Sequence, residues 1–240
     1  MSGRLAKRAW LTAQAKDPVV SLEGEQLVTV KVAAQAGAKS VRNRRKYMTR
    51  RIFCHYSYLR ERCQFDKIVS MHEELKKLLK ETGAVKFGDF TLSSGKKSDF
   101  YVDCRKVTLH PKGAKLIGKI ILDKIKGLKV DAVGGMTLGA DPITGAVVTL
   151  SDIPGFIVRK KEKEHGTKQK IEGIIASGYN VVIVEDVATT GGSALQAIEA
   201  VESVGAKVIK VISVLDREEG ARAALKNYDF DPILKKSDLV

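Results

Sequence analysis

One stretch, residues 181–193, constrains the fold and the chemistry of this chain more than any other. Four consecutive β-branched residues, 181–184, predict a buried strand, and two carboxylates, Glu185 and Asp186, follow at its C-terminal end. A turn of small and hydroxylated residues comes next, and a helical pattern begins at Ala194. Free backbone amides and the helix dipole make such a turn a site for a phosphate group. The adjacent carboxylates suit sugar hydroxyls or a magnesium ion.

This stretch has two other interpretations. A strand that ends in two acids also occurs in P-loop NTPases, but that class needs a G-x-x-x-x-G-K-[ST] loop elsewhere. The nearest candidate, residues 95–98, lacks the upstream glycine because Phe90 stands there, so we set this class aside. The second interpretation is an ordinary strand–loop–helix unit whose helix is capped by Thr190 or Ser193.

The full stretch resembles the phosphoribosyl-pyrophosphate (PRPP) binding motif of type I phosphoribosyltransferases, and other segments are most similar to orotate phosphoribosyltransferases. The resemblance runs from about Met71 to about Leu225. It implies that the acidic pair holds the ribose hydroxyls, that Asp186 is catalytic, and that the turn cradles the 5′-phosphate. The PRPP-binding residues implied here are Glu185, Asp186, Val187, Ala188, Thr189, Thr190, Gly191, Gly192 and Ser193. The resemblance also places Thr189 beside orotate.

Residues 87–103 contain two aromatic, β-rich runs around a Ser-Gly-Lys turn, a pattern that predicts a hairpin. The segment resembles the hood of orotate phosphoribosyltransferases, which lies over the orotate ring. The resemblance implies that Phe100 and Tyr101 bind orotate. Ser93 stands where the bacterial pattern has a lysine, and Lys96 is a candidate to replace that contact. The alternative is a packing lid without ligand contact.

Residues 130–135 form a short predicted strand that enters a glycine turn, and residues 137–142 open another helix. This region resembles the pyrophosphate loop of the superfamily, where backbone amides bind the diphosphate. Bacterial members have a lysine at the position of Leu138, so the resemblance implies a main-chain role here and no charge at this position. The alternative is a tight strand–helix turn in which Gly139 only provides clearance.

A polar, highly charged segment follows the predicted strand at residues 156–159. Loops of this length in compact α/β domains are often functional lids, although a charge run is usually a solvated face. The order R-K-x-x-K-x-H-G resembles the mobile catalytic loop of orotate phosphoribosyltransferases. It implies that Arg159, Lys160, Lys163 and His165 contact PRPP, with Lys163 and His165 catalytic. Because this loop commonly reaches into the neighbouring subunit's site, the resemblance also implies a homodimer with shared active sites.

A strand is predicted at residues 207–215, and the sequence after it resembles the L-D-R-x-x-G motif of the family. The resemblance implies that Arg217 binds the orotate carboxylate, a role that suits the planar guanidinium fork. The alternative is a surface contact between Arg217 and Glu218. A closing helix is predicted at residues 221–227, and the chain from Pro232 onward is predicted to be a short tail.

The first 66 residues differ in charge from the rest of the chain. Residues 1–66 hold 14 Lys and Arg against 5 Asp and Glu, whereas the remainder holds 28 against 23. Basic residues cluster at positions 42–51 near several aromatic residues, a combination that is able to contact nucleic acid. No helix-turn-helix or RNA-binding pattern accompanies it. We therefore expect a basic, loosely folded or disordered extension at residues 1–66, a phosphoribosyltransferase domain at residues 67–240, and no nucleic-acid partner.

Ser70 and Glu73 form a capping-box pattern, which predicts that the first helix of the domain begins there and ends at Gly83. Met71 is a candidate for the true initiator. Three cysteines without C-x-x-C spacing favour a reducing cytoplasm. No apolar run reaches the length of a membrane span.

Strands alternate with helices from about residue 85 to 225, which predicts an α/β fold: a parallel sheet flanked by helices, with a small N-terminal hood. The resemblance implies transfer of the 5-phosphoribosyl group from PRPP to orotate, giving orotidine 5′-monophosphate and pyrophosphate in UMP synthesis. It implies that Mg²⁺ binds with the substrate, without a metal site of the protein's own. Two alternatives remain: a phosphoribosyltransferase for another base, and a PRPP-sensing regulator with a nucleic-acid-binding arm.

Overall fold

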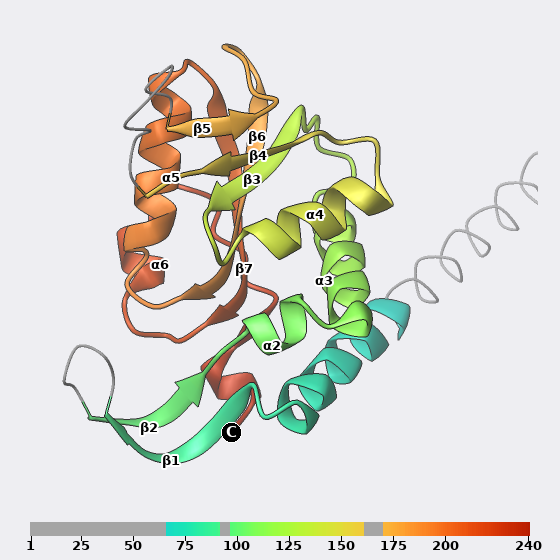
Figure 1. Cartoon of the computed structure of the whole chain (residues 1–240), viewed down its shortest axis with the longest axis vertical. Helices are drawn as coiled ribbons and strands as arrows, with labels where there is room; N and C mark the ends of the chain where they lie inside the picture. The colour runs from blue at the N-terminus through green and yellow to red at the C-terminus, as the bar shows by residue number, and fades with distance from the viewer. Residues whose placement is uncertain (1–65, 92–96, 161–169) are drawn as a thin grey trace, which may run out of the picture. The chain divides into compact units, whose positions relative to one another are not determined.

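The computed structural model describes residues 66–91, 97–160 and 170–240. A six-stranded sheet with strand order β5-β4-β3-β6-β7-β8 forms its centre (Figure 1). The strands are β3 (Ala132–Met136), β4 (Gly155–Val158), β5 (Ile171–Gly173), β6 (Asn180–Ala188), β7 (Lys207–Asp216) and β8 (Leu234–Lys235). Neighbouring strands are parallel, as predicted, except that β5 runs antiparallel to β4. The exception arises because the chain returns from β4 directly to the edge beside it.

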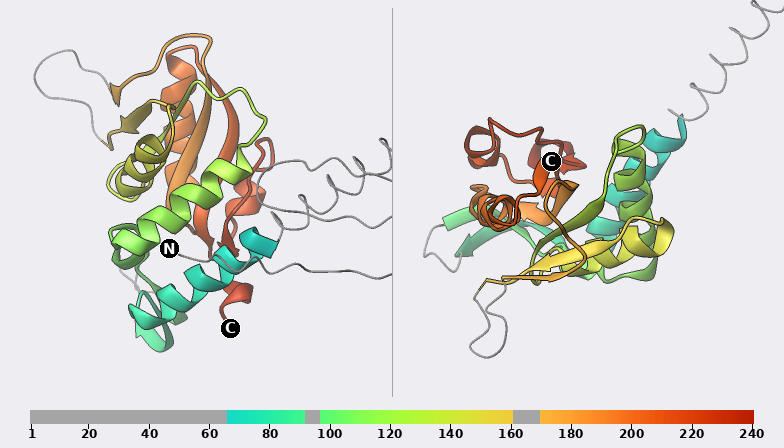
Figure 2. Two further views of the ribbon diagram at one scale, coloured as in Figure 1. Left: turned by 90° about the vertical axis from the view of Figure 1, so that its right-hand side faces the viewer. Right: turned by 90° about the horizontal axis from the view of Figure 1, so that it is seen from above.

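Helices cover both faces of the sheet (Figure 2). One face packs against the helix of residues 66–81, α3 (Pro111–Lys124) and α4 (Asp141–Leu150), and the other against α5 (Gly192–Ser203). In β6, Val182 and Val184 lie in the first core cluster, whereas Val181 and Ile183 lie in the second. All four side chains are fully buried, and each contributes roughly 1.5–3 kcal/mol of hydrophobic free energy. The run of β-branched residues therefore marks the central, doubly covered strand.

The hood is the antiparallel pair β1 (Val85–Thr91) and β2 (Lys97–Val102), which confirms the predicted hairpin. The side chain of Phe100 is fully buried in the first core cluster, and its ring centroid lies 5.4 Å from that of Phe87. The turn that contains Ser93 and Lys96 lies outside the described residues. A four-residue helix, α2 (Arg105–Thr108), follows the hood and was not predicted.

The predicted start of the first helix is wrong. Residues 66–69 are already helical, so Ser70 is inside the helix and cannot act as its N-cap. A Ser-x-x-Glu pair also fits a helix interior. Residues 66–69 contain neither glycine nor proline, so nothing in them prevents the helix from starting before Ser70. The predicted end is confirmed, because Gly83 has a φ of +60°, a conformation that glycine adopts without a steric penalty.

The end of the chain also differs from its prediction. The closing helix α6 (Ala221–Ala224) is shorter than expected, because the chain turns back to the sheet, where Phe230 bridges to Val211. The predicted tail instead forms β8 and the 3-10 turn η1 (Lys236–Asp238).

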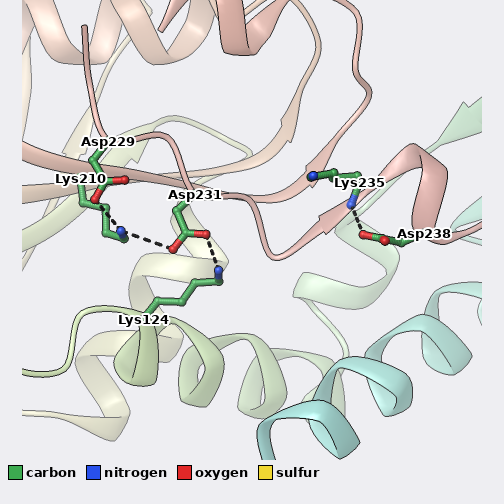
Figure 3. Close-up of polar contacts among 6 residues, drawn as sticks. All are labelled: Lys124, Lys210, Asp229, Asp231, Lys235 and Asp238. Atoms are coloured by element: carbon green, nitrogen blue, oxygen red, sulfur yellow. Dashed lines mark hydrogen bonds and ion pairs between the residues drawn. The ribbon is translucent and has the colours of Figure 1, made fainter. Parts of the chain in front are cut away.

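A buried lysine ties β7 to the helical layer (Figure 3). Lys210 Nζ lies 2.6 Å from Asp229 Oδ2 and 3.3 Å from Asp231 Oδ2, and Lys124 Nζ of α3 lies 2.6 Å from Asp231 Oδ1. Burial opposes the charge of Lys210, but the hydrogen bond to Asp229 and the charge of Asp231 outweigh it and raise the pKa of Lys210. Within the described part of the chain, no helix is both long and apolar enough to cross a membrane.

Candidate active site

A cavity of about 440 Å³ opens at the C-terminal ends of β3 and β6. This is the edge of a parallel sheet at which ligands of α/β proteins bind. Its lining residues are Val102, Asp103, Cys104, Arg105, Met136, Thr137, Leu138, Gly139, Lys160, Glu185, Asp186, Val187 and Ser193. Lining segments therefore come from the hood, α2, the loop after β3, the start of the charged segment, and the end of β6.

Glu185, one of the residues that line this cavity, has an unsatisfied hydrogen-bond acceptor. Oε2 of Glu185 is buried and has no hydrogen-bond partner. Burial, and then the charge of Asp186, raise the pKa of Glu185 to about 7, and a hydrogen bond with Ser193 opposes the rise. Burial also raises the pKa of Asp186, although the amide of Val187 donates to its Oδ1 at 2.9 Å. A ligand that brings hydroxyl groups or a cation would satisfy both carboxylates.

The turn after the acidic pair presents backbone amides. Gly191 has a φ of +83° and precedes α5, and the amide of Leu195 donates to the Gly191 carbonyl at 2.9 Å. The amides of residues 191–193 come before that bond and have no carbonyl of their own helix to pair with. These amides lie at the N-terminal end of α5, where the helix dipole is positive, so this turn is suited to an anion.

The loop after β3 packs directly against Asp186. The peptide bond between Thr137 and Leu138 is cis, and the Thr137 hydroxyl donates to Asp141 Oδ2 at 2.7 Å. A Cβ atom on Gly139 would lie 2.3 Å from Oδ1 of Asp186. The absence of a side chain at Gly139 therefore leaves room for the carboxylate of Asp186. The side chain of Leu138 is 70% exposed.

Two cations line the cavity in the described part of the chain. Lys160 is one, as predicted, and Arg105 is the other. Arg105 Nε lies 2.9 Å from Asp103 Oδ1, and its charge lowers the pKa of Asp186 against the larger effect of burial. Arg159 instead pairs with Glu172 of β5, with Nη1 3.1 Å from Oε1.

Arg217 lies at the junction of β7 and the hood. Its side chain is buried, and it donates to Glu219 Oε1 from Nε at 2.9 Å and from Nη2 at 2.8 Å. Nη2 also donates to the Phe100 carbonyl at 3.3 Å, and the guanidinium carbon lies 5.5 Å from the centre of the Phe100 ring. The amide of Arg217 donates to the Ala188 carbonyl at 2.9 Å. The loop after β7 is therefore bonded to the end of β6, where the turn that leads to α5 begins. The alternative of an exposed Arg217–Glu218 contact is wrong.

Comparisons with known proteins agree with this geometry. The family model described as phosphoribosyl transferase domain matches residues 106–233. The orotate phosphoribosyltransferase of Rhodopirellula baltica is 52% identical over 157 residues, which cover 61% of this chain and 81% of that one. The enzyme of Methanocaldococcus jannaschii is 47% identical over 164 residues, covering 68% and 93%. The structure of Mycobacterium tuberculosis orotate phosphoribosyltransferase in complex with PRPP is similar with a TM-score of 0.61 at 36% identity, covering 70% and 98%.

This chain belongs to the orotate phosphoribosyltransferase family. As an orotate phosphoribosyltransferase, it transfers the 5-phosphoribosyl group from PRPP to orotate, which yields orotidine 5′-monophosphate and pyrophosphate in pyrimidine biosynthesis. The comparisons thus favour the orotate reaction over a transferase for another base and over a PRPP-sensing regulator. The fold prediction is confirmed, with the addition of the antiparallel edge strand.

The structure brings together some of the predicted site residues, whereas Ala188, Thr189, Thr190, Gly191 and Gly192 do not line the cavity. The acidic pair, Ser193 and Lys160 line one cavity, and Phe100 contacts Arg217 through its carbonyl. Lys163 and His165 lie outside the described residues. Phe100 is fully buried and does not line the cavity, whereas Tyr101 is 38% exposed.

Sequence reasoning missed Asp103 and Arg105. The available signal was the Asp-x-Arg pattern that begins two residues after Tyr101 of the hood. A strand end that delivers an acid and a base is typical of a site rim. Cys104 between them is fully buried, and burial raises the pKa of its thiol, so this cysteine is not a nucleophile at neutral pH.

Proposed function

We propose that PRPP binds in the cavity at the ends of β3 and β6, and that orotate binds beside it against Arg217. The observation that carries this proposal is the buried, unpartnered Oε2 of Glu185, a residue that lines the same cavity as Ser193 at the start of α5. A buried carboxylate oxygen without a partner is costly in a folded protein. The ribose hydroxyls of PRPP would satisfy it.

Each part of the cavity then has a part of PRPP to hold. The amides and hydroxyls of residues 189–193 bind the 5′-phosphate, and Glu185 and Asp186 accept hydrogen bonds from the ribose hydroxyls. The main chain of residues 137–139 binds the diphosphate, with Arg105 and Lys160 facing its negative charge. The M. tuberculosis relative in complex with PRPP supports PRPP as the ligand.

The orotate end of the site is formed by Arg217, Thr189 and the hood. The Arg217 guanidinium pairs with the orotate carboxylate, which takes the place of the Glu219 carboxylate that Nε and Nη2 bind in this structure. The backbone around Phe100 and Tyr101 lies against the ring. Arg217 is already held by Phe100 and Glu219, so little side-chain entropy is lost when orotate binds.

The reaction itself needs positioning and charge stabilisation. Pyrophosphate leaves the anomeric carbon, the orotate nitrogen attaches with inversion, and positive charge develops on the ribose ring. Asp186 and Glu185 lie on the side where this charge develops, and fixed charges in a water-poor site are effective stabilisers. We assign Lys163 and His165 to the departing pyrophosphate, which they neutralise when the charged segment closes over the site.

Mg²⁺ fits this site as a partner of the substrate. The described residues contain no group of three or more His, Cys, Asp or Glu side chains that could hold a metal ion. The two carboxylates at the end of β6 are nevertheless hard oxygen donors of the kind that Mg²⁺ takes together with phosphate oxygens. We therefore propose that Mg²⁺ enters bound to PRPP and supplies charge neutralisation on the diphosphate.

We further propose a homodimer with shared sites, because the charged segment resembles the loop that reaches into the neighbouring subunit in this family. A complementation experiment tests it. Lys163→Ala and Asp186→Asn variants, each inactive alone, are mixed under conditions that exchange subunits. Recovery of activity supports sharing, because one site of the mixed dimer then holds both wild-type residues. No recovery from a dimer shown to be mixed would overturn it.

We place the catalytic activity in residues 67–240 and the protein in the cytoplasm. The family match lies within residues 106–233, and the described Cys104 is a free thiol, as reducing compartments favour.

Binding of PRPP with Mg²⁺, measured by calorimetry, tests the function of the cavity directly. Wild-type protein should bind, and Asp186→Asn should bind at least about tenfold more weakly, as expected when a charged hydrogen bond is lost. Equal binding by both would contradict the assignment.

A further inference from the structure

The last residues of the chain pack against the orotate end of the site. β8 pairs with the end of β7, with Leu215 opposite Leu234 and Asp216 opposite Lys235, directly before Arg217. Leu239 is 2% exposed and belongs to the same core cluster as Phe100. The family model ends at residue 233, so it does not include this segment. Residues 234–239, which we call the C-terminal turn, are therefore an ordered part of the domain.

The C-terminal turn makes hydrogen bonds to Glu218, the residue that follows Arg217. The Ser237 amide donates to Glu218 Oε2 at 2.9 Å, and the Ser237 hydroxyl donates to Glu218 Oε1 at 3.2 Å. Glu218 has a φ of +60°, and its amide donates to Asp216 Oδ1 at 2.8 Å. A left-handed conformation is unfavourable for a residue with a side chain, and the surrounding contacts must maintain it. Ser237 supplies two of those contacts.

The C-terminal turn also holds the hood. Lys236 Nζ lies 2.9 Å from Asp99 Oδ1 and 5.4 Å from the centre of the Phe100 ring. The guanidinium of Arg217 lies 5.5 Å from the centre of the same ring and donates to the Phe100 carbonyl. The side chain of Lys236 is only 26% exposed. Lys236 and Arg217 therefore act on one aromatic residue of β2, Phe100.

We propose that the C-terminal turn is a positioning element for orotate, with Lys236 fixing the hood at Phe100 and Ser237 fixing the Arg217 loop through Glu218. The two parts of the orotate site come from β2 and from the loop after β7, which are far apart in the sequence. The C-terminal turn contacts both β2 and the loop after β7. It therefore sets the distance between the Phe100 backbone and the Arg217 guanidinium. This inference rests on the proposed role of Arg217.

Steady-state kinetics of the full chain test the proposal through Lys236→Met. We expect the KM for orotate to rise by roughly two- to fivefold, the range for an ion pair whose carboxylate is exposed, while the KM for PRPP is unchanged. Lys236→Arg should restore the orotate KM, because a guanidinium keeps both the Asp99 pair and the ring contact.

Lys235→Met is the matched control. It removes the same charge one position earlier, where the side chain is exposed and the backbone amide makes the hydrogen bond to Asp238 (Figure 3). We expect wild-type kinetics from it. An orotate KM for Lys236→Met equal to that of Lys235→Met would overturn the proposal, as would an equal rise in both KM values accompanied by a lower Tm.

Arg217→Lys in the same series distinguishes failure of the positioning role from failure of the proposed orotate site. If it raises the orotate KM while Lys236→Met does not, the positioning role fails and the orotate site stands. If Arg217→Lys leaves the orotate KM unchanged, the orotate site itself is misplaced and the positioning role falls with it.

Discussion

Gly139 and Asp186 approach each other so closely that a side chain at position 139 would displace the Asp186 carboxylate. An added Cβ would lie 2.3 Å from Asp186 Oδ1 and 2.6 Å from its carboxyl carbon. The loop after β3 and the acidic end of β6 therefore fix each other's position. In the proposed function, these two segments hold the diphosphate and the ribose of the same PRPP molecule.

Gly139→Ala should lower kcat/KM for PRPP by about a hundredfold, because misplacement of a positioned group by about an ångström has effects of that size. Gly145→Ala is the matched control. Gly145 is exposed in α4, and no atom lies within 4 Å of its added Cβ, so the substitution should leave activity intact and stabilise the helix by about 0.5–1 kcal/mol. Wild-type activity from Gly139→Ala would contradict the coupling of loop and carboxylate.

Glu185 should make the ligand-free protein less stable as the pH rises. Its pKa is about 7 in the folded chain, against an ordinary value of 4.5. Between these values the folded state retains a proton that the unfolded state has lost, so the free energy of unfolding falls with rising pH. Above pH 7 the loss is complete and amounts to about 3 kcal/mol.

Glu185→Gln should remove this dependence while it weakens PRPP binding. Urea unfolding at pH 5 and pH 8 measures the effect. The variant should gain stability relative to wild type on going from pH 5 to pH 8. If the difference between the two proteins is the same at both pH values, Glu185 does not titrate in this range.

Arg217→Lys should raise the KM for orotate by on the order of thirtyfold, because lysine retains the charge but loses the paired hydrogen bonds to a carboxylate. The affinity for PRPP should not change, since Arg217 does not line the PRPP cavity. Parallel titrations with orotate and with PRPP separate the two effects. Loss of PRPP binding in this variant would show that Arg217 maintains the fold of the turn at Ala188, and its role toward orotate would then be unsupported.

Lys163→Ala should reduce turnover far more than it weakens orotate binding, because the lysine is assigned to charge that develops on the leaving pyrophosphate. The kcat and the Kd for orotate, measured on the same preparation, decide this. A loss of equal size in both quantities would contradict the assigned role.

The sequence predicted the parts of the site that are local. The strand β6, the acidic pair and the start of α5 follow one another in the chain, so one pattern of β-branched, acidic and small residues specifies all three. The hood was predictable for the same reason, since a hairpin joins neighbours in sequence.

What the sequence did not predict depends on contacts between distant segments. Asp103 and Arg105 line the same cavity as the end of β6 because the chain leaves the hood there and enters α2, a four-residue helix that packs against α3. So short a helix has no periodicity to detect. The C-terminal turn was predicted to be a tail because the two residues of β8 show no alternation. Its order comes from pairing with β7 and from the burial of Leu239, which become visible only in the fold.

The most direct test of the account follows the absorbance of orotate after the full chain is mixed with PRPP and Mg²⁺. We expect the absorbance to fall as orotidine 5′-monophosphate forms. The fall should require PRPP, and Asp186→Asn should abolish it. A chain that consumes no orotate while it still binds PRPP would contradict the central claim, because the site would then hold PRPP without transferring its ribosyl group to orotate.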